Sequence, residues 1–238
     1  VVSLENAGLY RDLSLALERQ VALTEAYSRF TPKAFLDALG KSSILDVRLG
    51  DQTEGDMTVL FADIRGYSTL SEQMSAEENF AFINRFLERT TPIIGAHRGV
   101  VSRFLGDAIM AFFPRSADDA LAAGKALFSE VSVYNRERDQ KGRERIRVGV
   151  GLHSGPLMIG IIGDRDRMEP TLLSDTVNIA SRMEGLTKEH KAQIILSAET
   201  RSRLRDPGTH GLVDLGERPI RGRKGAVRVY GWFTEGRS

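Results

Sequence analysis

The sequence predicts an α+β fold, in which helices cover a mostly antiparallel sheet. Two observations support this prediction. Short runs rich in β-branched and aromatic residues alternate with long amphipathic segments, the first at residues 75–97. Several of these short runs also follow one another directly, which is typical of hairpins and therefore of antiparallel pairing. We expect the helices on one face of the sheet, as a ferredoxin-like or palm-type sandwich.

Composition narrows the range of functions. The 238 residues suit one large domain with an appendage, and 33 Lys and Arg against 32 Asp and Glu give a net charge of +1. This balance argues against a nucleic-acid-binding surface. The absence of cysteine excludes disulfides, thiolate metal sites and a cysteine nucleophile. No apolar run reaches the ~20 residues that span a bilayer. The absence of cysteine fits a reducing compartment, and we expect a cytoplasmic domain.

The chain begins with Val1 rather than methionine. We therefore expect a fragment of a longer protein that lacks an upstream sensory or membrane domain. Whether that parent protein is anchored in a membrane stays open.

Residues 1–42 are predicted to form a helical lead-in, and residues 43–238 the globular domain. A heptad pattern within residues 9–30 favours a parallel coiled coil. The alternative is an amphipathic helix that packs on its own domain. Thr31-Pro32 and Gly40 frame a second, short helix. The heptad positions are Leu9, Leu13, Ala16, Gln20, Leu23, Tyr27 and Phe30.

The globular domain alternates strands and helices. Ser75 and Glu78 form a capping box before one long helix, and Ser116 caps a second that ends before Lys141. A third helix is expected at residues 175–186, after a polar loop at 164–170. Strands are expected at residues 44–49, 57–61, 100–104, 108–113, 146–152, 157–162 and 193–196, with two more within 211–233 joined by the basic turn 221–225.

Two aspartates mark a candidate metal site. Asp63 ends an apolar strand, and Asp107 occupies a hairpin turn between two more apolar strands. Taken singly, each is more typical of turn chemistry than of a ligand. If the strands are neighbours in the sheet, both carboxylates emerge at the same end, which suits a hard divalent cation. Carboxylate pairs of this kind hold Mg²⁺ for phosphoryl chemistry.

Asn178 and Arg182 mark a second candidate site. On a helix they stand at positions i and i+4 and share one face. An amide beside a guanidinium offers hydrogen-bond donors to an anion or to a developing phosphate charge. The alternative is an ordinary exposed helical face, with Arg182 paired to a glutamate.

Three segments then show a family resemblance. Residues 61–67 (FADIRGY), 104–112 (FLGDAIMAF) and 175–184 (DTVNIASRME) resemble the signature segments of the class III nucleotidyl cyclase catalytic domain, in that family's order and spacing. The resemblance covers residues 44–233. It implies a head-to-tail homodimer with two active sites at its interface. There the ribose 3′-hydroxyl of ATP or GTP attacks the α-phosphate, and pyrophosphate leaves.

The resemblance also implies roles for residues at matching positions. Asp63 and Asp107 match the ligands of two Mg²⁺ or Mn²⁺ ions, and Ile64 matches a position that lends its backbone carbonyl. Asn178 matches the asparagine that orients the ribose. Arg182 matches the arginine that stabilises charge on the α-phosphate.

Further matches concern the triphosphate and the base. The basic turn supplies Lys224 for the triphosphate, with Arg223 as the alternate. Arg103 and Thr171 occupy the base-reading positions. Arg103 can only donate hydrogen bonds, and adenine N1 accepts one where guanine N1 carries a proton. We therefore expect an adenylyl cyclase that makes 3′,5′-cyclic AMP for signal transduction. The alternatives are a guanylyl cyclase and a catalytically silent nucleotide-binding regulatory domain.

Overall fold

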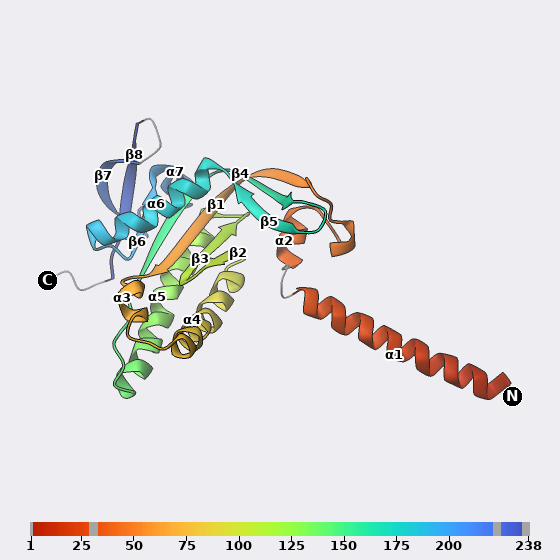
Figure 1. Cartoon of the computed structure of the whole chain (residues 1–238). Helices are drawn as coiled ribbons and strands as arrows, with labels where there is room; N and C mark the ends of the chain where they lie inside the picture. Colours follow the sequence, from red (N-terminus) through yellow and green to blue (C-terminus); the bar gives the residue numbers. More distant parts are fainter. Residues whose placement is uncertain (1, 29–32, 221–224, 235–238) are drawn as a thin grey trace. The chain divides into compact units, whose positions relative to one another are not determined.

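The structure is a computed structural model that describes residues 2–28, 33–220 and 225–234. The chain divides into two compact units, residues 1–48 and 49–238, and Figure 1 traces the chain through each. Among the described helices, none combines the length and the apolar composition needed to cross a bilayer.

The first unit is helical, and its long helix α1 (Val2–Ser28) carries the predicted heptad positions except Phe30, which lies outside the described residues. Large apolar side chains along this helix are exposed. The exposed fraction is 67% for Leu9, 66% for Leu13 and 62% for Tyr27. The described part of this unit therefore leaves an apolar stripe uncovered.

The predicted strand at residues 44–49 is wrong. After helix α2 (Lys33–Ala38), the chain forms the 3₁₀ turn η1 (Ile44–Asp46) instead. The Ser43 hydroxyl accepts a hydrogen bond from the Leu45 N–H at 3.2 Å and caps this turn. Serine side chains can compete in this way with extended pairing of the backbone. A short apolar run was therefore an insufficient signal for a strand.

The described part of the second unit contains one sheet of eight strands, and its mostly antiparallel pairing is confirmed. The order is β2-β3-β1-β4-β6-β8-β7, with β5 paired to β4 outside this path. In the described sheet, β4 and β6 form the parallel pair. The strands are β1 (Gln52–Ile64), β2 (Val100–Leu105), β3 (Ala108–Phe113), β4 (Val148–Gly163), β5 (Met168–Leu173), β6 (Ile194–Ser197), β7 (Val213–Pro219) and β8 (Ala226–Trp232).

Strand β4 replaces the two separate strands predicted at residues 146–152 and 157–162. Pro156 lies inside it without breaking it. The Pro156 carbonyl accepts hydrogen bonds from the hydroxyls of Ser174 and Thr176, so it points away from the partner strand β1. The nitrogen of a residue in a strand points to the same side as its carbonyl, so the missing N–H removes no hydrogen bond to β1.

The polar loop predicted at residues 164–170 is shorter in the structure, because strand β5 begins at Met168. The Asp164 carboxylate accepts hydrogen bonds from the N–H groups of Asp166 and Arg167, at 2.9 and 2.8 Å. This tight turn lets β5 pair with β4 from Met168 onward. Aspartate is well suited to such turns because its carboxylate reaches its own following backbone.

Local capping explains where the helices begin. Ser75 Oγ accepts from the Glu78 N–H at 3.2 Å while Glu78 Oε2 accepts from the Ser75 N–H at 2.8 Å, which confirms the capping box. Ser116 Oγ accepts from the Asp118 N–H at 3.1 Å and caps the second long helix as predicted. The helices are α3 (Tyr67–Ser71), α4 (Ala76–Ala96), α5 (Ala117–Gln140), α6 (Asp175–His190) and α7 (Ala198–Ser202).

Helices lie on both faces of the sheet. The prediction that all helices cover one face is wrong, because α6 lies on the face opposite α4 and α5. Side chains alternate along β4. Val148 and Val150 lie in the core that includes α4 and α5, whereas Gly149 and Gly151 lie against α6. Figure 1 shows α6 over one side of the sheet and α5 over the other. Two glycines thus let α6 approach β4 closely.

Gly151→Ala tests this close approach. A Cβ atom at residue 151 would lie 2.1 Å from the Glu184 nitrogen and 2.5 Å from the Ala180 carbonyl oxygen. We expect overpacking to lower the free energy of unfolding by about 1–3 kcal/mol or more, measured by denaturant titration. Gly185→Ala is the control, because nothing lies within 4 Å of its added Cβ and alanine favours helix by about 1 kcal/mol. Equal stability of the two variants would contradict the packing described.

Candidate active site

The sheet brings the two predicted carboxylates together. Strands β1 and β3 are neighbours, with Ala62 opposite Ile109, so Asp63 lies beside the turn that precedes β3. That turn consists of Gly106 and Asp107, between β2 and β3. Gly106 has φ 67°, a conformation that glycine adopts without strain. The expectation that both carboxylates emerge at one end of the sheet is therefore met.

The electrostatics of this pair suit a divalent cation. Burial, followed by the hydrogen bond and the negative charge of Asp63, raises the pKa of Asp107 to about 7, while the N–H groups of Asp107 and Ile64 act to lower it. A cation beside the two carboxylates would favour the ionised form of Asp107. Among the described residues no group of three or more His, Asp or Glu could hold a metal ion. Backbone or substrate oxygens would have to complete its coordination.

Sequence reasoning missed two charged side chains beside Asp63. Glu184 on α6 is 8% exposed, and burial, followed by the charge of Asp63, raises its pKa to about 7. Lys188 and Arg65 act on that pKa in the opposite direction. Arg65 Nη2 donates to the Ala192 carbonyl, and burial lowers the pKa of Arg65. Their positions in the sequence could have indicated both residues. Arg65 follows Asp63 by two residues, and Glu184 is the last residue of the third motif, residues 175–184.

A basic hollow of about 560 Å³ adjoins this end of β1. It combines two arginines and two lysines. Such a cluster favours an anion. Two of its cations, Arg65 and Lys188, lie near Glu184 and lower its pKa. The lining residues are Arg65, Gly66, Arg147, Lys188, Lys191 and Gln193.

Asn178 and Arg182 lie on α6 as predicted, and both side chains are exposed. Glu184 faces Asp63, because the two charges interact. Positions two residues apart on an α-helix differ by about 200° in direction, so Arg182 points away from Asp63. In the described part of the chain, no ion pair joins Arg182 to a glutamate. One chain therefore does not bring this pair to the carboxylates.

A β-bulge sets the direction of Arg103. Val101 pairs with Ala111 and Arg103 pairs with Met110, so β2 carries one extra residue, Ser102, at this point. Ala111 belongs to the core on the α4 and α5 side, and its neighbour Met110 faces the other way. Arg103 therefore faces away from that core. Bulges commonly redirect a side chain in this manner.

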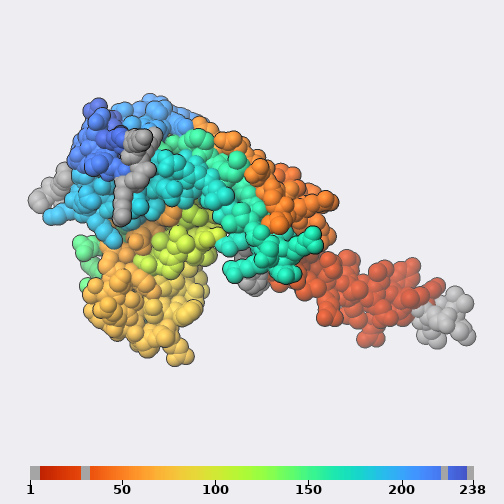
Figure 2. Space-filling model, turned by 45° about the horizontal axis from the view of Figure 1, so that its top comes forward, coloured from red at the N-terminus to blue at the C-terminus, as the bar shows by residue number. Residues whose placement is uncertain are grey.

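Glu169 on β5 contacts Arg103 and lies two residues before Thr171. The Arg103 guanidinium forms an ion pair with Glu169 on β5. Thr171 follows Glu169 by two residues and shares its face of the strand. In Figure 2 the yellow-green β2–β3 hairpin lies between the gold α4 and the teal β4–β5 hairpin. Lys224 and Arg223 lie outside the described residues.

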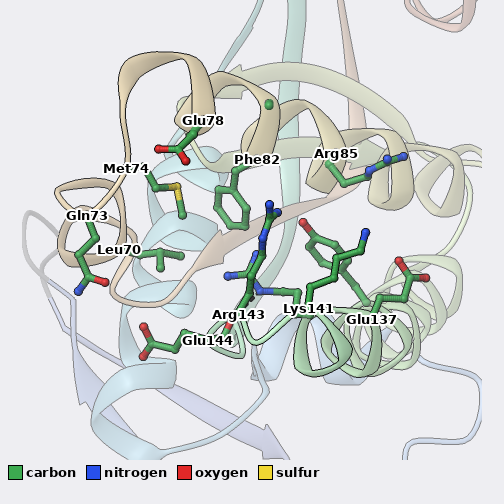
Figure 3. Close-up of a pocket in the computed structure, with 13 residues that line it drawn as sticks. Leu70, Gln73, Met74, Glu78, Phe82, Arg85, Glu137, Lys141, Arg143 and Glu144 are labelled. Atoms are coloured by element: carbon green, nitrogen blue, oxygen red, sulfur yellow. Dashed lines mark hydrogen bonds between the residues drawn. The ribbon is translucent and has the colours of Figure 1, made fainter.

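A cavity of about 520 Å³ between α3, α4 and the end of α5 is a poor candidate for the active site. Figure 3 shows that Phe82 and Arg143 line it, and none of the predicted site residues does. Its most buried cation, Arg138, lies over the Phe82 ring at 5.0 Å and donates to the Glu144 carbonyl at 2.6 Å. These contacts fix the guanidinium between the Phe82 ring and the chain that follows α5, which is a structural role.

Comparison with known proteins gives a consistent result. The model of the adenylate and guanylate cyclase catalytic domain family matches residues 49–234. An adenylate cyclase of Anabaena cylindrica is 32% identical over 225 residues, which are 92% of this chain and 45% of that protein. A terminal-differentiation-specific adenylate cyclase of Dictyostelium discoideum is 33% identical over 222 residues, or 91% of this chain and 10% of that protein. The chain thus spans less than half of either relative.

Solved structures show the same fold. A bacterial light-regulated adenylyl cyclase aligns with a TM-score of 0.79 and 25% identity, covering 94% of this chain and 64% of that one. The adenylyl cyclase CyaB from P. aeruginosa gives a TM-score of 0.69 and 27% identity, covering 78% and 97%. The guanylate cyclase domain of RhGC from Catenaria anguillulae, solved with GTP, gives 0.64 and 25%, covering 75% and 96%.

Proposed function

Because this chain belongs to the adenylate and guanylate cyclase catalytic domain family, we propose that it converts ATP to 3′,5′-cyclic AMP and pyrophosphate. The observation that supports this most strongly is the half-buried carboxylate pair Asp63 and Asp107. A hollow with four cationic side chains begins at Arg65, two residues after Asp63. Carboxylates for metal ions beside cations for phosphates are the parts that a phosphoryl-transfer site requires.

Asp63 and Asp107 would hold two Mg²⁺ or Mn²⁺ ions, with the Ile64 carbonyl as a further ligand. A cation at this pair would favour the ionised form of Asp107, whose pKa is raised by burial and by Asp63. When bound, such ions promote ionisation of the ribose 3′-hydroxyl and neutralise charge on the phosphates. Asn178 orients the ribose, and the Arg182 guanidinium donates hydrogen bonds to the α-phosphate as negative charge develops on it. Lys224, or Arg223, binds the triphosphate.

The active site is proposed to form between two copies of this chain. Asn178 and Arg182 are exposed and point away from Asp63 within one chain. A head-to-tail homodimer would place this pair from one copy against the carboxylates of the other, and twofold symmetry would create two such sites. Exposed apolar side chains at the hairpins next to the site support a partner surface. They are Phe104, Leu105, Met168 and Leu173.

ATP is the proposed substrate because of the chemistry beside β5. Arg103 presents only donors, which adenine N1 can accept and guanine N1–H cannot. Thr171 is 8% exposed and can donate or accept. A guanylyl cyclase is the second candidate, since a solved guanylate cyclase domain shares the fold. A silent nucleotide-binding domain is disfavoured, because each described catalytic position holds a competent side chain.

A turnover assay tests the function. Purified protein is offered ATP or GTP, each with Mg²⁺ or Mn²⁺, and the cyclic nucleotide is quantified by chromatography. We expect cyclic AMP in the presence of metal, and a larger kcat/KM for ATP than for GTP. Cyclic GTP as the main product would favour the second candidate. Absence of both products under all four conditions would refute cyclase activity.

The lead-in, proposed as residues 1–42, is assigned to dimerisation and signalling. The uncovered stripe on α1 suits a parallel coiled coil with a second copy. Such a coil would transmit a rotation from an upstream sensory or membrane domain of the parent protein to catalytic domains in the cytoplasm.

Deletion of residues 1–30 tests this assignment. We expect a larger dimer dissociation constant, measured by analytical ultracentrifugation, and lower specific activity at low protein concentration, since each site needs two chains. At high concentration the truncated protein should approach the activity of the full chain. Identical dissociation constants and identical activity at low concentration would show that the stripe has no part in dimerisation.

A further inference from the structure

The cavity between α3, α4 and the end of α5 contains a buried cation with unused hydrogen-bond donors. Arg138 is 3% exposed, and its Nε–H donates to the Glu144 carbonyl. The guanidinium lies over the Phe82 ring, at 5.0 Å, and over the Tyr134 ring, at 5.6 Å. Within the described residues, no acceptor pairs with Nη1 or Nη2 of this guanidinium. Its two outer nitrogens therefore leave N–H donors unpaired at the cavity wall.

A second buried polar group of the same cavity also lacks a partner. Tyr134 lines the cavity and is 7% exposed, and no residue that the structure describes forms a hydrogen bond with its hydroxyl. Tyr134 and Arg138 are one helical turn apart on α5, so their side chains share one face. Buried polar groups are nearly always paired, because an unpaired one loses its hydration without replacement. Two unpaired donor groups side by side point to a ligand that accepts from both.

One wall of the cavity is apolar and flexible. Leu70 and Met74 are partly buried and pack against the main core. Figure 3 shows them on one side of the cavity and Lys141 on the other. Methionine adapts its shape to a neighbour, and the Phe82 ring already stacks on the Tyr67 ring, with centroids 6.5 Å apart. A flexible aliphatic chain therefore suits this wall better than a further aromatic ring.

The charges around the cavity favour a monoanion. Four cationic side chains and three carboxylates line it, which leaves a surplus of one positive charge. The carboxylates would repel a polyphosphate, whereas a single carboxylate can pair with a guanidinium through two N–H groups. The cations are Arg85, Arg138, Lys141 and Arg143, and the carboxylates are Glu78, Glu137 and Glu144.

We propose that this cavity binds an aliphatic monocarboxylate, whose carboxylate accepts hydrogen bonds from Arg138 and Tyr134 while its chain lies along the apolar wall. The volume of about 520 Å³ is within the range of small-molecule pockets. None of the described residues assigned to the active site lines the cavity. The ligand is therefore an addition to the proposed function and does not depend on it.

Calorimetric titration of the purified full chain with octanoate, in metal-free buffer, is the direct test. We expect saturable binding of one octanoate per chain, with a dissociation constant in the micromolar to millimolar range. Octanamide has the same chain without the charge, and acetate has the charge without the chain. Each should bind about tenfold more weakly or worse. ATP added without metal should leave the affinity for octanoate unchanged.

Two substitutions locate the bound carboxylate. Tyr134→Phe removes only the unpaired hydroxyl, so the unfolding midpoint without ligand should not fall, and the dissociation constant should rise about fivefold. Arg138→Met removes the charge but keeps an apolar side chain of similar length, and should raise the constant about tenfold or more. Tyr230→Phe and Arg136→Met are the matched controls. Neither Tyr230 nor Arg136 lines the cavity, so both controls should keep the native affinity.

Any of four results would overturn the proposal. The native protein could show no saturable binding of octanoate, or could bind octanamide equally well, which would exclude a role for the guanidinium. Folded Tyr134→Phe and Arg138→Met proteins with native affinity, or displacement of octanoate by ATP, would place octanoate outside this cavity. If Arg138→Met does not fold, Tyr134→Phe decides alone. Cyclase activity, present or absent, does not alter any of these readouts.

Discussion

Asp63→Asn and Asp107→Asn are each expected to lower turnover by about 10³-fold or more, because each removes a charge that both metal ions share. Removing a single transition-state donor already costs about 10²–10³ in rate, and a shared ligand of two cations contributes more charge stabilisation. Initial rates with saturating ATP and a titration of Mg²⁺ or Mn²⁺ measure the loss.

The fold should survive both changes. Asp63 and Asp107 share a hydrogen bond and are partly buried, so one amide in place of one carboxylate relieves repulsion and still donates to its neighbour. We expect unfolding midpoints in metal-free buffer at or above that of the native protein. Asp56→Asn is a matched control on the same strand, since that side chain is exposed and pairs with Arg203 at 2.7 Å. Metal-dependent activity retained by a folded Asp63 or Asp107 variant would refute the metal site.

Arg182→Ala is expected to lower kcat by about 10²–10³ with a smaller change in KM, as for removal of a donor that acts mainly in the transition state. Its stability should hold, because the side chain is exposed and alanine favours helix. Ser181→Ala, at the neighbouring exposed position of α6, should keep native activity. If kcat of Arg182→Ala equalled that of Ser181→Ala, Arg182 would have no part in the chemistry.

The sequence predicted most elements of the fold from signals that are local. Capping residues such as Ser75 act within one turn, and strand periodicity acts over a few residues. The errors arose where tertiary contacts decide. Pro156 reads as a strand break until the orientation of its carbonyl toward α6 is known. Helix α6 packs on the face of the sheet where Gly149 and Gly151 have no side chains to block it. The hydrophobic periodicity of the sequence does not show which face of the sheet a helix covers.

The candidate site was predictable in part for the same reason. Asp63 and Asp107 stand out because each interrupts an apolar pattern at a strand end or a turn. Glu184 and Glu169 do not stand out, because their partners come from strands distant in the sequence. The direction of Arg103 depends on a one-residue bulge, and the alternating pattern of a strand does not show where such a bulge lies.

The central claim, that two chains share each active site, is tested most directly by mixing two inactive variants. The Asp63→Asn protein keeps Asn178 and Arg182 intact, and the Arg182→Ala protein keeps its carboxylates. A mixed dimer then has one wholly intact site and one doubly damaged site. With statistical exchange about half of the dimers are mixed, so an equimolar mixture should recover about a quarter of native activity. No recovery, with subunit exchange demonstrated independently, would show that each chain builds its site alone and would contradict the account.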